Sequence, residues 1–200
     1  MERLVISPTQ VGLYEYMLVA QPDASVNEKV KAEKLQFKHY QKSPGTCSPH
    51  IKVASFFARE PMEETIIRYM QRIFSQQQSF EVALNNYSGY PPHTIYLRIQ
   101  NPKPFKHLAN ELTAISNYVS SCSCPLPKLV THPYLPIAKK LPDSMYFQAL
   151  MDCSQKTFHE TFVVNELVLL RRNNKYGTTK PVHVFRLQPP AATAKDSFYN

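Results

Sequence analysis

Residues 49–56, PHIKVASF, have the alternating pattern of a half-buried β-strand with a histidine near its start. His50 and Lys52 alternate with Ile51 and Val53, and side chains two residues apart in a strand point to the same face. The apolar pair therefore predicts a face packed on a core. His50 and Lys52 are expected together on the opposite face, toward a cleft.

The elements around this strand occur in an order that repeats. In each unit an extended segment is followed by a helix and then by two more strands. The extended segments are expected over 50–57, 79–87 and 93–100 in the first unit, and over 128–139, 157–172 and 181–188 in the second. Two such units predict an α+β fold of two pseudo-symmetric β-α-β-β lobes, with antiparallel sheets flanked by helices around a central cleft.

The boundaries of the domain follow from this order. We expect an N-terminal segment over 1–12, a single bilobal domain over 13–188 and a flexible tail over 189–200, where PPAATAKDSFYN lacks apolar periodicity. Within the domain, the lobe with the first motif is expected over about 44–120 and the second lobe over about 125–188.

Helix signals lie between the strands. Residues 25–28, SVNE, form a capping box that predicts the start of a helix. Apolar residues over 62–74, and again over 105–119, recur at the spacing of one helix face. In the extended segment 128–139, two prolines cannot donate to a sheet ladder, so this segment is expected to be an edge strand or an irregular strand.

Composition narrows the range of partners and cofactors. The 23 lysines and arginines against 15 acidic residues give a net charge of +8, which favours anionic partners such as RNA, DNA or nucleotides. With only 4 glycines, the chain has no Gly-rich phosphate loop. Cys122 and Cys124 form a C-x-C pair, which is not the spacing of most zinc sites. We therefore expect no metal and no cofactor.

Membrane and export signals are lacking in the printed sequence. No apolar run approaches the roughly 20 residues needed to span a bilayer. The opening residues, MERLVISPTQ, contain no apolar stretch of the kind found in secretory signals. We expect a cytoplasmic protein that does not contact membranes, and a monomer.

Residues 49–56 and the later stretch 133–141, PYLPIAKKL, resemble the two motifs of the two-histidine (2H) phosphoesterases. That superfamily includes the RNA 2′-5′ ligase-like proteins and cyclic phosphodiesterases. Its signature is His-apolar-Ser/Thr-apolar, once per lobe, and the second copy often continues into Ala-Arg. The resemblance covers most of residues 13–188 and puts His50 in the first histidine position. It implies metal-independent opening of cyclic phosphates, with one histidine taking a proton and the other giving one.

The sequence departs from this signature at three positions. Lys52 stands in the first hydroxyl position, Tyr134 in the second histidine position and Pro136 in the second hydroxyl position. A tyrosine, with a pKa near 10, is a poor acid at neutral pH, and proline has no N–H to donate. His132 lies two residues before Tyr134 with the same strand parity, which puts it about 6–7 Å out of place along the strand.

The resemblance supplies the candidate site. His50 and His132 are the candidate catalytic pair, and the candidate substrate-binding residues are Lys52, Tyr134, Arg98 and Lys139. We expect a basic cleft that binds an RNA end, a nucleotide or a cyclic phosphodiester, with reduced or lost catalysis.

Two alternatives stay open. One is an active, metal-independent cyclic phosphodiesterase or 2′-5′ RNA ligase-like enzyme that uses His50 and His132. The other is a protein-interaction module that keeps only the fold. Tyr87, Tyr90 and Tyr96 could stack on nucleobases if the fold gathers them at the cleft.

Overall fold

The computed structural model describes residues 12–40, 48–91, 93–173 and 177–190. These residues form nine strands and five α-helices. The expected N-terminal segment and C-terminal tail lie almost entirely outside them. In chain order the elements are β1 (Leu13–Ala20), α1 (Ala24–Gln36), η1 (Lys38–Tyr40), β2 (Ile51–Arg59), η2 (Glu60–Met62), α2 (Glu63–Phe74), β3 (Phe80–Tyr90), β4 (Thr94–Ile99), α3 (Lys103–Glu111), α4 (Thr113–Ser121), β5 (Lys128–Leu129), β6 (Tyr134–Ala138), α5 (Asp143–Ser154), β7 (His159–Val164), β8 (Glu166–Arg172) and β9 (Lys180–Arg186).

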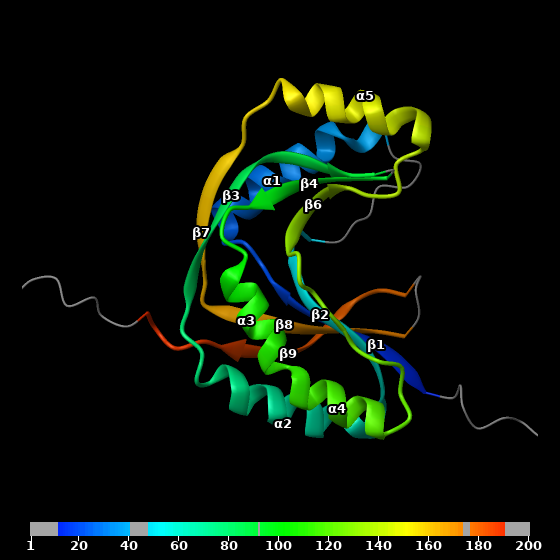
Figure 1. The fold of residues 1–200 in the computed structure, drawn as a ribbon, viewed down its shortest axis with the longest axis vertical. Helices are drawn as coiled ribbons and strands as arrows, with labels where there is room; N and C mark the ends of the chain where they lie inside the picture. The colour runs from blue at the N-terminus through cyan, green and yellow to red at the C-terminus, as the bar shows by residue number, and fades with distance from the viewer. Residues whose placement is uncertain (1–11, 41–47, 92, 174–176, 191–200) are drawn as a thin grey trace, which may run out of the picture.

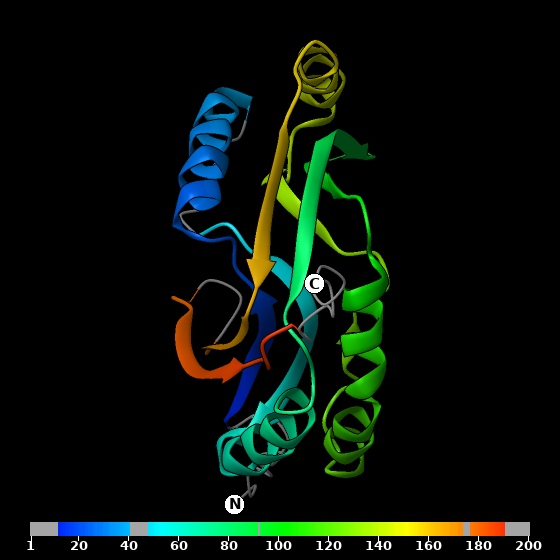
Figure 2. The same ribbon diagram turned by 90° about the vertical axis from the view of Figure 1, so that its left-hand side faces the viewer.

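The strands form two antiparallel sheets. One sheet has the order β5-β2-β1-β8-β9 and the other has the order β6-β4-β3-β7. Helices α1 and α5 pack on the four-stranded sheet, whereas α2 packs on β9 of the five-stranded sheet (Figure 1). The turned view shows α1 (blue) and α3 and α4 (green) on opposite sides of the strands (Figure 2). The expected α+β fold, with antiparallel sheets flanked by helices, is confirmed.

The two sheets are not built from two consecutive parts of the chain. Strands β3 and β4, expected in the lobe over 44–120, pair with β6 and β7. Strands β8 and β9 are expected with β6 in the lobe over 125–188. In the structure, β8 pairs with β1, and β9 pairs with β8. Each sheet therefore combines strands from both expected ranges. The order of elements predicts which strands form, but long-range pairing decides the sheet that each strand joins.

Local signals set the ends of the helices. Asp23, in extended backbone, caps α1: its Oδ1 accepts a hydrogen bond from the backbone N–H of Val26 at 2.9 Å. The expected cap from Ser25 is wrong, because that residue already lies inside the first turn. The single helix expected over 105–119 is two helices, and the side chain of Thr113 donates to the carbonyl of Asn110 at the break.

One continuous core joins both sheets to their helices. On β1, Tyr16 and Leu18 belong to this core, whereas Met17 and Val19 point to the other face of the sheet. There they form a second, small apolar cluster with Val168 and Leu170 of β8. Since Val19 pairs with Lys52 of β2, this second face is the one that carries Lys52.

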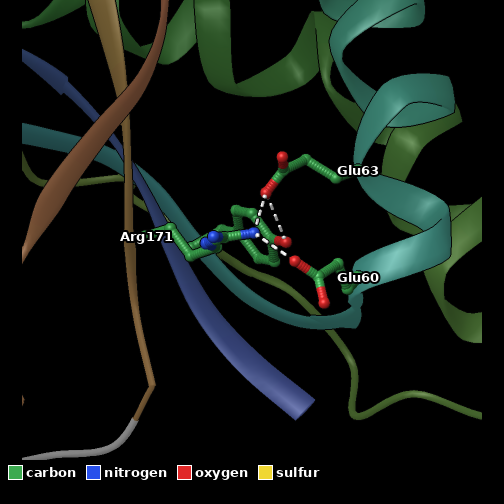
Figure 3. Close-up of polar contacts among 4 residues, drawn as sticks. Glu60, Glu63 and Arg171 are labelled. Atoms are coloured by element: carbon green, nitrogen blue, oxygen red, sulfur yellow. Dashed lines mark hydrogen bonds and ion pairs between the residues drawn. The ribbon is translucent and has the colours of Figure 1, made fainter. Parts of the chain in front are cut away.

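Charged and aromatic side chains attach α2 to the five-stranded sheet (Figure 3). Arg171 Nη1 lies 2.8 Å from Glu63 Oε2 and 3.2 Å from Glu60 Oε1. The hydroxyl of Tyr16 donates to the same Glu63 oxygen at 2.9 Å. Burial, together with Glu63, raises the pKa of Tyr16, so this hydroxyl keeps its proton. The ion pairs belong to the scaffold and lie outside the pocket described below.

Membrane-crossing helices are not found in the part of the chain that the structure describes, where none is long and apolar enough.

Candidate functional site

A pocket of about 80 Å³ lies where the chain passes from one sheet to the other. Residues 128–138 pair with β2 of the five-stranded sheet through β5, and with β4 of the four-stranded sheet through β6. Between them, the backbone N–H of Val130 donates to the carbonyl of Val53 at 2.9 Å. The pocket is lined by His50, Lys52, Val130, Tyr134, Pro136 and Lys139.

His50 is the buried group of this pocket, with 8% of its surface exposed. Its Nδ1 lies 2.8 Å from the carbonyl oxygen of Ser48. A carbonyl can only accept, so Nδ1 carries the proton and Nε2 is an acceptor. Burial lowers the pKa of His50 to about 4, and the positive charges of Lys139, Lys52 and Lys34 act in the same direction. The imidazole is therefore neutral at neutral pH.

Among the described residues, three lysines from different parts of the fold act on His50. Lys52 comes from β2, Lys139 follows β6, and Lys34 comes from α1, which packs against β6. None of the described residues that line the pocket is acidic. An arrangement of this kind attracts anions, and lysine binds phosphate as a point charge.

The side of the pocket formed by β6 is aromatic. The rings of Tyr134 and Tyr96 lie 4.9 Å apart between centroids. Burial raises the pKa of Tyr134, and the nearby Tyr90 and Tyr96 add to this effect. Its hydroxyl therefore stays protonated at neutral pH and can donate a hydrogen bond. Pro136 pairs with Tyr96 across the sheet and has no N–H to offer.

Strands β2 and β6 each have an irregular pairing register beside the pocket. The β1–β2 register skips Val53, next to Lys52, and the β4–β6 register skips Ile137, next to Pro136. Irregularities of this type redirect neighbouring side chains and are frequent at functional sites. Each of the two motif strands therefore has an irregularity next to a residue that lines the pocket.

The structure brings together four of the six residues predicted from the sequence. His50, Lys52, Tyr134 and Lys139 line the pocket, whereas His132 and Arg98 do not. His132 is exposed ahead of β6, with Nδ1 3.0 Å from Thr131 Oγ1. Arg98 pairs with Tyr134 in the sheet, but it is exposed and its Nε donates to the carbonyl of Asn85 at 3.1 Å.

The tyrosines separate into two groups. Tyr90 and Tyr96 share with Tyr134 the sheet face turned away from α1 and α5, and Tyr90 is 69% exposed. The hydroxyl of Tyr87 instead donates to Glu33 of α1 at 2.6 Å, and its ring packs against Phe37 and Phe158. Tyr87 is therefore a packing residue, whereas the other three form an aromatic surface beside the pocket.

Sequence reasoning missed two residues near His50. Val130 lines the pocket from the segment between β5 and β6. Lys34 lies on α1, far away in the sequence, and no local pattern connects it with His50.

In the described part of the chain, no group of three or more His, Cys, Asp or Glu side chains could hold a metal ion.

Several solved structures have a similar fold. E. coli LigT complexed with 3′-AMP has a TM-score of 0.67 at 15% identity, with 88% of this chain and 98% of LigT covered. TT0787 of Thermus thermophilus has a TM-score of 0.65 at 14% identity, with 88% and 98% covered. A protein described as a phosphoesterase has a TM-score of 0.62 at 16% identity, with 87% and 98% covered. At these identities the likeness shows the fold alone.

Comparison of sequences identifies the family. No curated protein matches the chain. A family model described as the 2′-5′ RNA ligase superfamily matches residues 22–175, which is most of the chain and includes both motif strands. The protein therefore belongs to the 2′-5′ RNA ligase superfamily, and its fold is that of the 2H phosphoesterases LigT and TT0787.

Proposed function

We propose that this protein binds the phosphate of a nucleotide or an RNA end in the pocket around His50, with two-histidine catalysis reduced or lost. The observation that carries the proposal is the composition of the pocket. Among the described residues that line it, His50 is the single histidine, and β6 supplies Tyr134 and Pro136. The described lining thus has groups that bind phosphate and no second imidazole.

Phosphate binding is supported by the charges. Lys52 and Lys139 line the pocket, and Lys34 lies close enough to act on the pKa of His50. The hydroxyl of Tyr134 adds a neutral donor. Ammonium and hydroxyl donors together match the oxygens of a phosphate group.

Nucleoside binding is supported by the aromatic surface. Tyr134 belongs both to the pocket and to the pair with Tyr96, and Tyr90 is close by. A base that stacks on an aromatic side chain gains about 1–3 kcal/mol. LigT, which has the same fold, has been solved with 3′-AMP, NADP+ and ATP. We infer that the base of a ligand lies against Tyr96 or Tyr90 while its phosphate enters the pocket.

Reduced catalysis follows from proton transfer. Opening a 2′,3′-cyclic phosphate requires one group that takes a proton and another that gives one to the leaving oxygen. The neutral Nε2 of His50 suits the first role. The raised pKa of Tyr134 makes it a weaker acid than free tyrosine, and Pro136 has no proton to give. Since His132 does not line the pocket, we assign it no part in the reaction.

The test uses a short RNA that ends in a 2′,3′-cyclic phosphate, without added metal. We expect binding but no ring opening above the rate without protein. Lys52→Ala should weaken binding roughly tenfold, as expected for loss of a phosphate contact. The matched control is Lys106→Ala, which removes the same charge from the exposed side of α3.

Other outcomes would favour the alternatives. Ring opening that disappears in both His50→Ala and His132→Ala would show an active two-histidine enzyme and contradict the proposal. No binding of RNA or nucleotide at low salt would favour a protein-interaction module. We include in the proposal the cytoplasmic residence and the monomeric state expected from the sequence, to be checked by cell fractionation and size-exclusion chromatography.

A further inference from the structure

The size of the pocket limits what it can enclose. Its volume is about 80 Å³. Pockets that enclose a whole drug-sized ligand usually measure about 300–1,000 Å³. If the proposed function holds, only the phosphate of a nucleotide enters this pocket, and the nucleoside stays outside, against the aromatic surface. The groups that line the pocket therefore act on the phosphate and on the atoms bonded next to it.

The charge of the lining distinguishes two kinds of phosphate. Lys52 and Lys139 line the pocket, Lys34 is near, and the described lining residues include no carboxylate. A phosphomonoester carries about −1.5 to −2 at neutral pH. A cyclic phosphodiester has no second ionisable oxygen, so its phosphate carries a single negative charge. Several lysines around one small pocket therefore attract the monoester more strongly.

His50 adds a second basis for selection. Its Nδ1–H is engaged with the carbonyl of Ser48, so Nε2 offers a lone pair rather than a proton. In a ribonucleotide with a terminal 3′-phosphate, the neighbouring 2′-hydroxyl is free and can donate to such an acceptor. In a 2′,3′-cyclic phosphate both ribose oxygens are esterified, and neither can donate.

We infer that this pocket selects a ribonucleotide with a terminal phosphomonoester beside a free hydroxyl, in preference to a cyclic phosphodiester. The lysines bind the dianionic phosphate, and His50 accepts from the adjacent hydroxyl. The inference rests on the proposed nucleotide-binding function and names its ligand class. A site of this kind binds the end of an RNA whose cyclic phosphate has already been opened.

The preference should depend on pH through the ligand. The second ionisation of a phosphomonoester lies near pH 6, whereas a diester has no such step. Among the described residues, the titratable groups around the phosphate are His50 and Lys52 of the β2 region, Lys34 of α1, Tyr134 and Lys139 of the β6 region, and Tyr96 and Tyr90 of β4 and β3. Since the pKa of His50 is about 4, its imidazole is predominantly neutral above pH 5.

Two ligands test the inference by titration calorimetry at constant ionic strength. They are adenosine 3′-monophosphate and adenosine 2′,3′-cyclic monophosphate. At about pH 7.5 we expect the monoester to bind at least roughly tenfold more tightly. At about pH 5 this ratio should fall several-fold, because the monoester then carries a single charge. Deoxyadenosine 3′-monophosphate, which lacks the 2′-hydroxyl, should bind more weakly than the ribonucleotide.

Variants assign the effect to the pocket. Lys139→Ala should reduce the affinity for the monoester more than the affinity for the cyclic nucleotide. Lys106→Ala, with the same loss of charge on α3, should change neither. His50→Ala should remove the difference between the ribonucleotide and the deoxynucleotide, which a merely structural role would not do. Circular dichroism of each variant checks that the fold is retained.

The results separate the two levels of the proposal. Equal or tighter binding of the cyclic nucleotide at about pH 7.5, or a ratio that does not change with pH, would overturn the inference and leave nucleotide binding intact. If neither nucleotide binds, both the inference and the proposed function are overturned. A preference that persists unchanged in Lys139→Ala and His50→Ala would also overturn the inference, because the selection would then arise outside this pocket.

Discussion

Strands β2 and β6 meet at the same pocket, and they differ in what they bring to it. Both bury the apolar half of their alternating pattern: Ile51 in β2 and Leu135 in β6 are both 0% exposed. On the face toward the pocket, His50 lies just before β2 and Lys52 lies within it, whereas β6 contributes Tyr134 and Pro136. The apolar positions belong to the core, and these positions of the other half line the pocket. On both strands the buried positions are apolar, whereas the positions that line the pocket differ in chemistry between the two strands.

The position of β6 in its sheet explains why this strand tolerates a proline. Within the described parts of the chain, β2 pairs with β1 on one side and with β5 on the other, whereas β6 pairs with β4 alone, at the edge of its sheet. A proline is tolerated at an edge or at an irregularity of a sheet, because no ladder hydrogen bond is lost there. Pro136 meets both conditions. At the corresponding position of β2, Lys52 pairs with Val19 of β1.

The largest expected effect comes from making β6 resemble β2. Tyr134→His combined with Pro136→Thr places an imidazole and a hydroxyl on the β6 side of the pocket. A positioned acid or base contributes about 10²–10⁴-fold to a rate, so ring opening of adenosine 2′,3′-cyclic monophosphate should rise by about this factor. The measurement is chromatography of the nucleotide product. Adding His50→Ala to the double variant should abolish the gain; a folded double variant without any gain would show that more than these two positions was lost.

The next effect tests whether the apolar half of β6 holds the fold. Leu135→Ala removes a fully buried side chain and should lower the free energy of unfolding by about 2–5 kcal/mol. The matched control is Leu35→Ala on α1, where the side chain is 67% exposed and the change should stay below about 0.5 kcal/mol. Urea denaturation measures both. Similar losses in the two variants would mean that β6 is not part of the core.

A somewhat smaller effect concerns the pH dependence contributed by the β2 side. Burial lowers the pKa of His50 from 6.5 to about 4. As the pH falls from 6.5 to 4, the unfolded state binds a proton that the folded state excludes. The free energy of unfolding should therefore fall by up to about 3 kcal/mol over this window because of His50. Above pH 6.5 the effect vanishes, since both states are neutral.

Substitution of the two histidines checks this effect by urea denaturation over the same pH range. His50→Asn should flatten the decline in stability relative to the wild type. His132→Asn, at the exposed position before β6, should leave the decline as it is. If His50→Asn declines as steeply as the wild type, the imidazole of His50 is not buried in its neutral form.

The smallest expected effect is at the rim. Arg98 pairs with Tyr134 in the sheet, yet it is exposed and bonded to the carbonyl of Asn85 rather than lining the pocket. Arg98→Ala should weaken nucleotide binding by less than about fivefold, the range of an exposed charge, and this loss should shrink as salt is added. Titration calorimetry at two salt concentrations measures it. A loss as large as that of Lys52→Ala would place Arg98 in direct contact with the phosphate.

Patterns that repeat over a few residues could be predicted from the sequence. The period of two in a strand made His50 share a face with Lys52, and Tyr134 with Pro136, and all four line the pocket. The helical period over 62–74 predicted the buried face of α2. Such predictions hold because the direction of a side chain depends on backbone geometry that is local to each element.

Contacts between distant residues were decided by the tertiary structure. Strands β3 and β4 pair with β7 and β6, respectively. Lys34 of α1 lies near His50. Tyr87 contacts α1, whereas Tyr90 and Tyr96 lie beside the pocket. His132 has the parity that the motif requires, yet it lies ahead of β6 and outside the pocket. The buried and exposed faces of the elements could be predicted from the sequence, because these faces follow from short-range geometry. Only the packing of the two sheets decided which faces meet, because that depends on the burial of apolar surface across the whole chain.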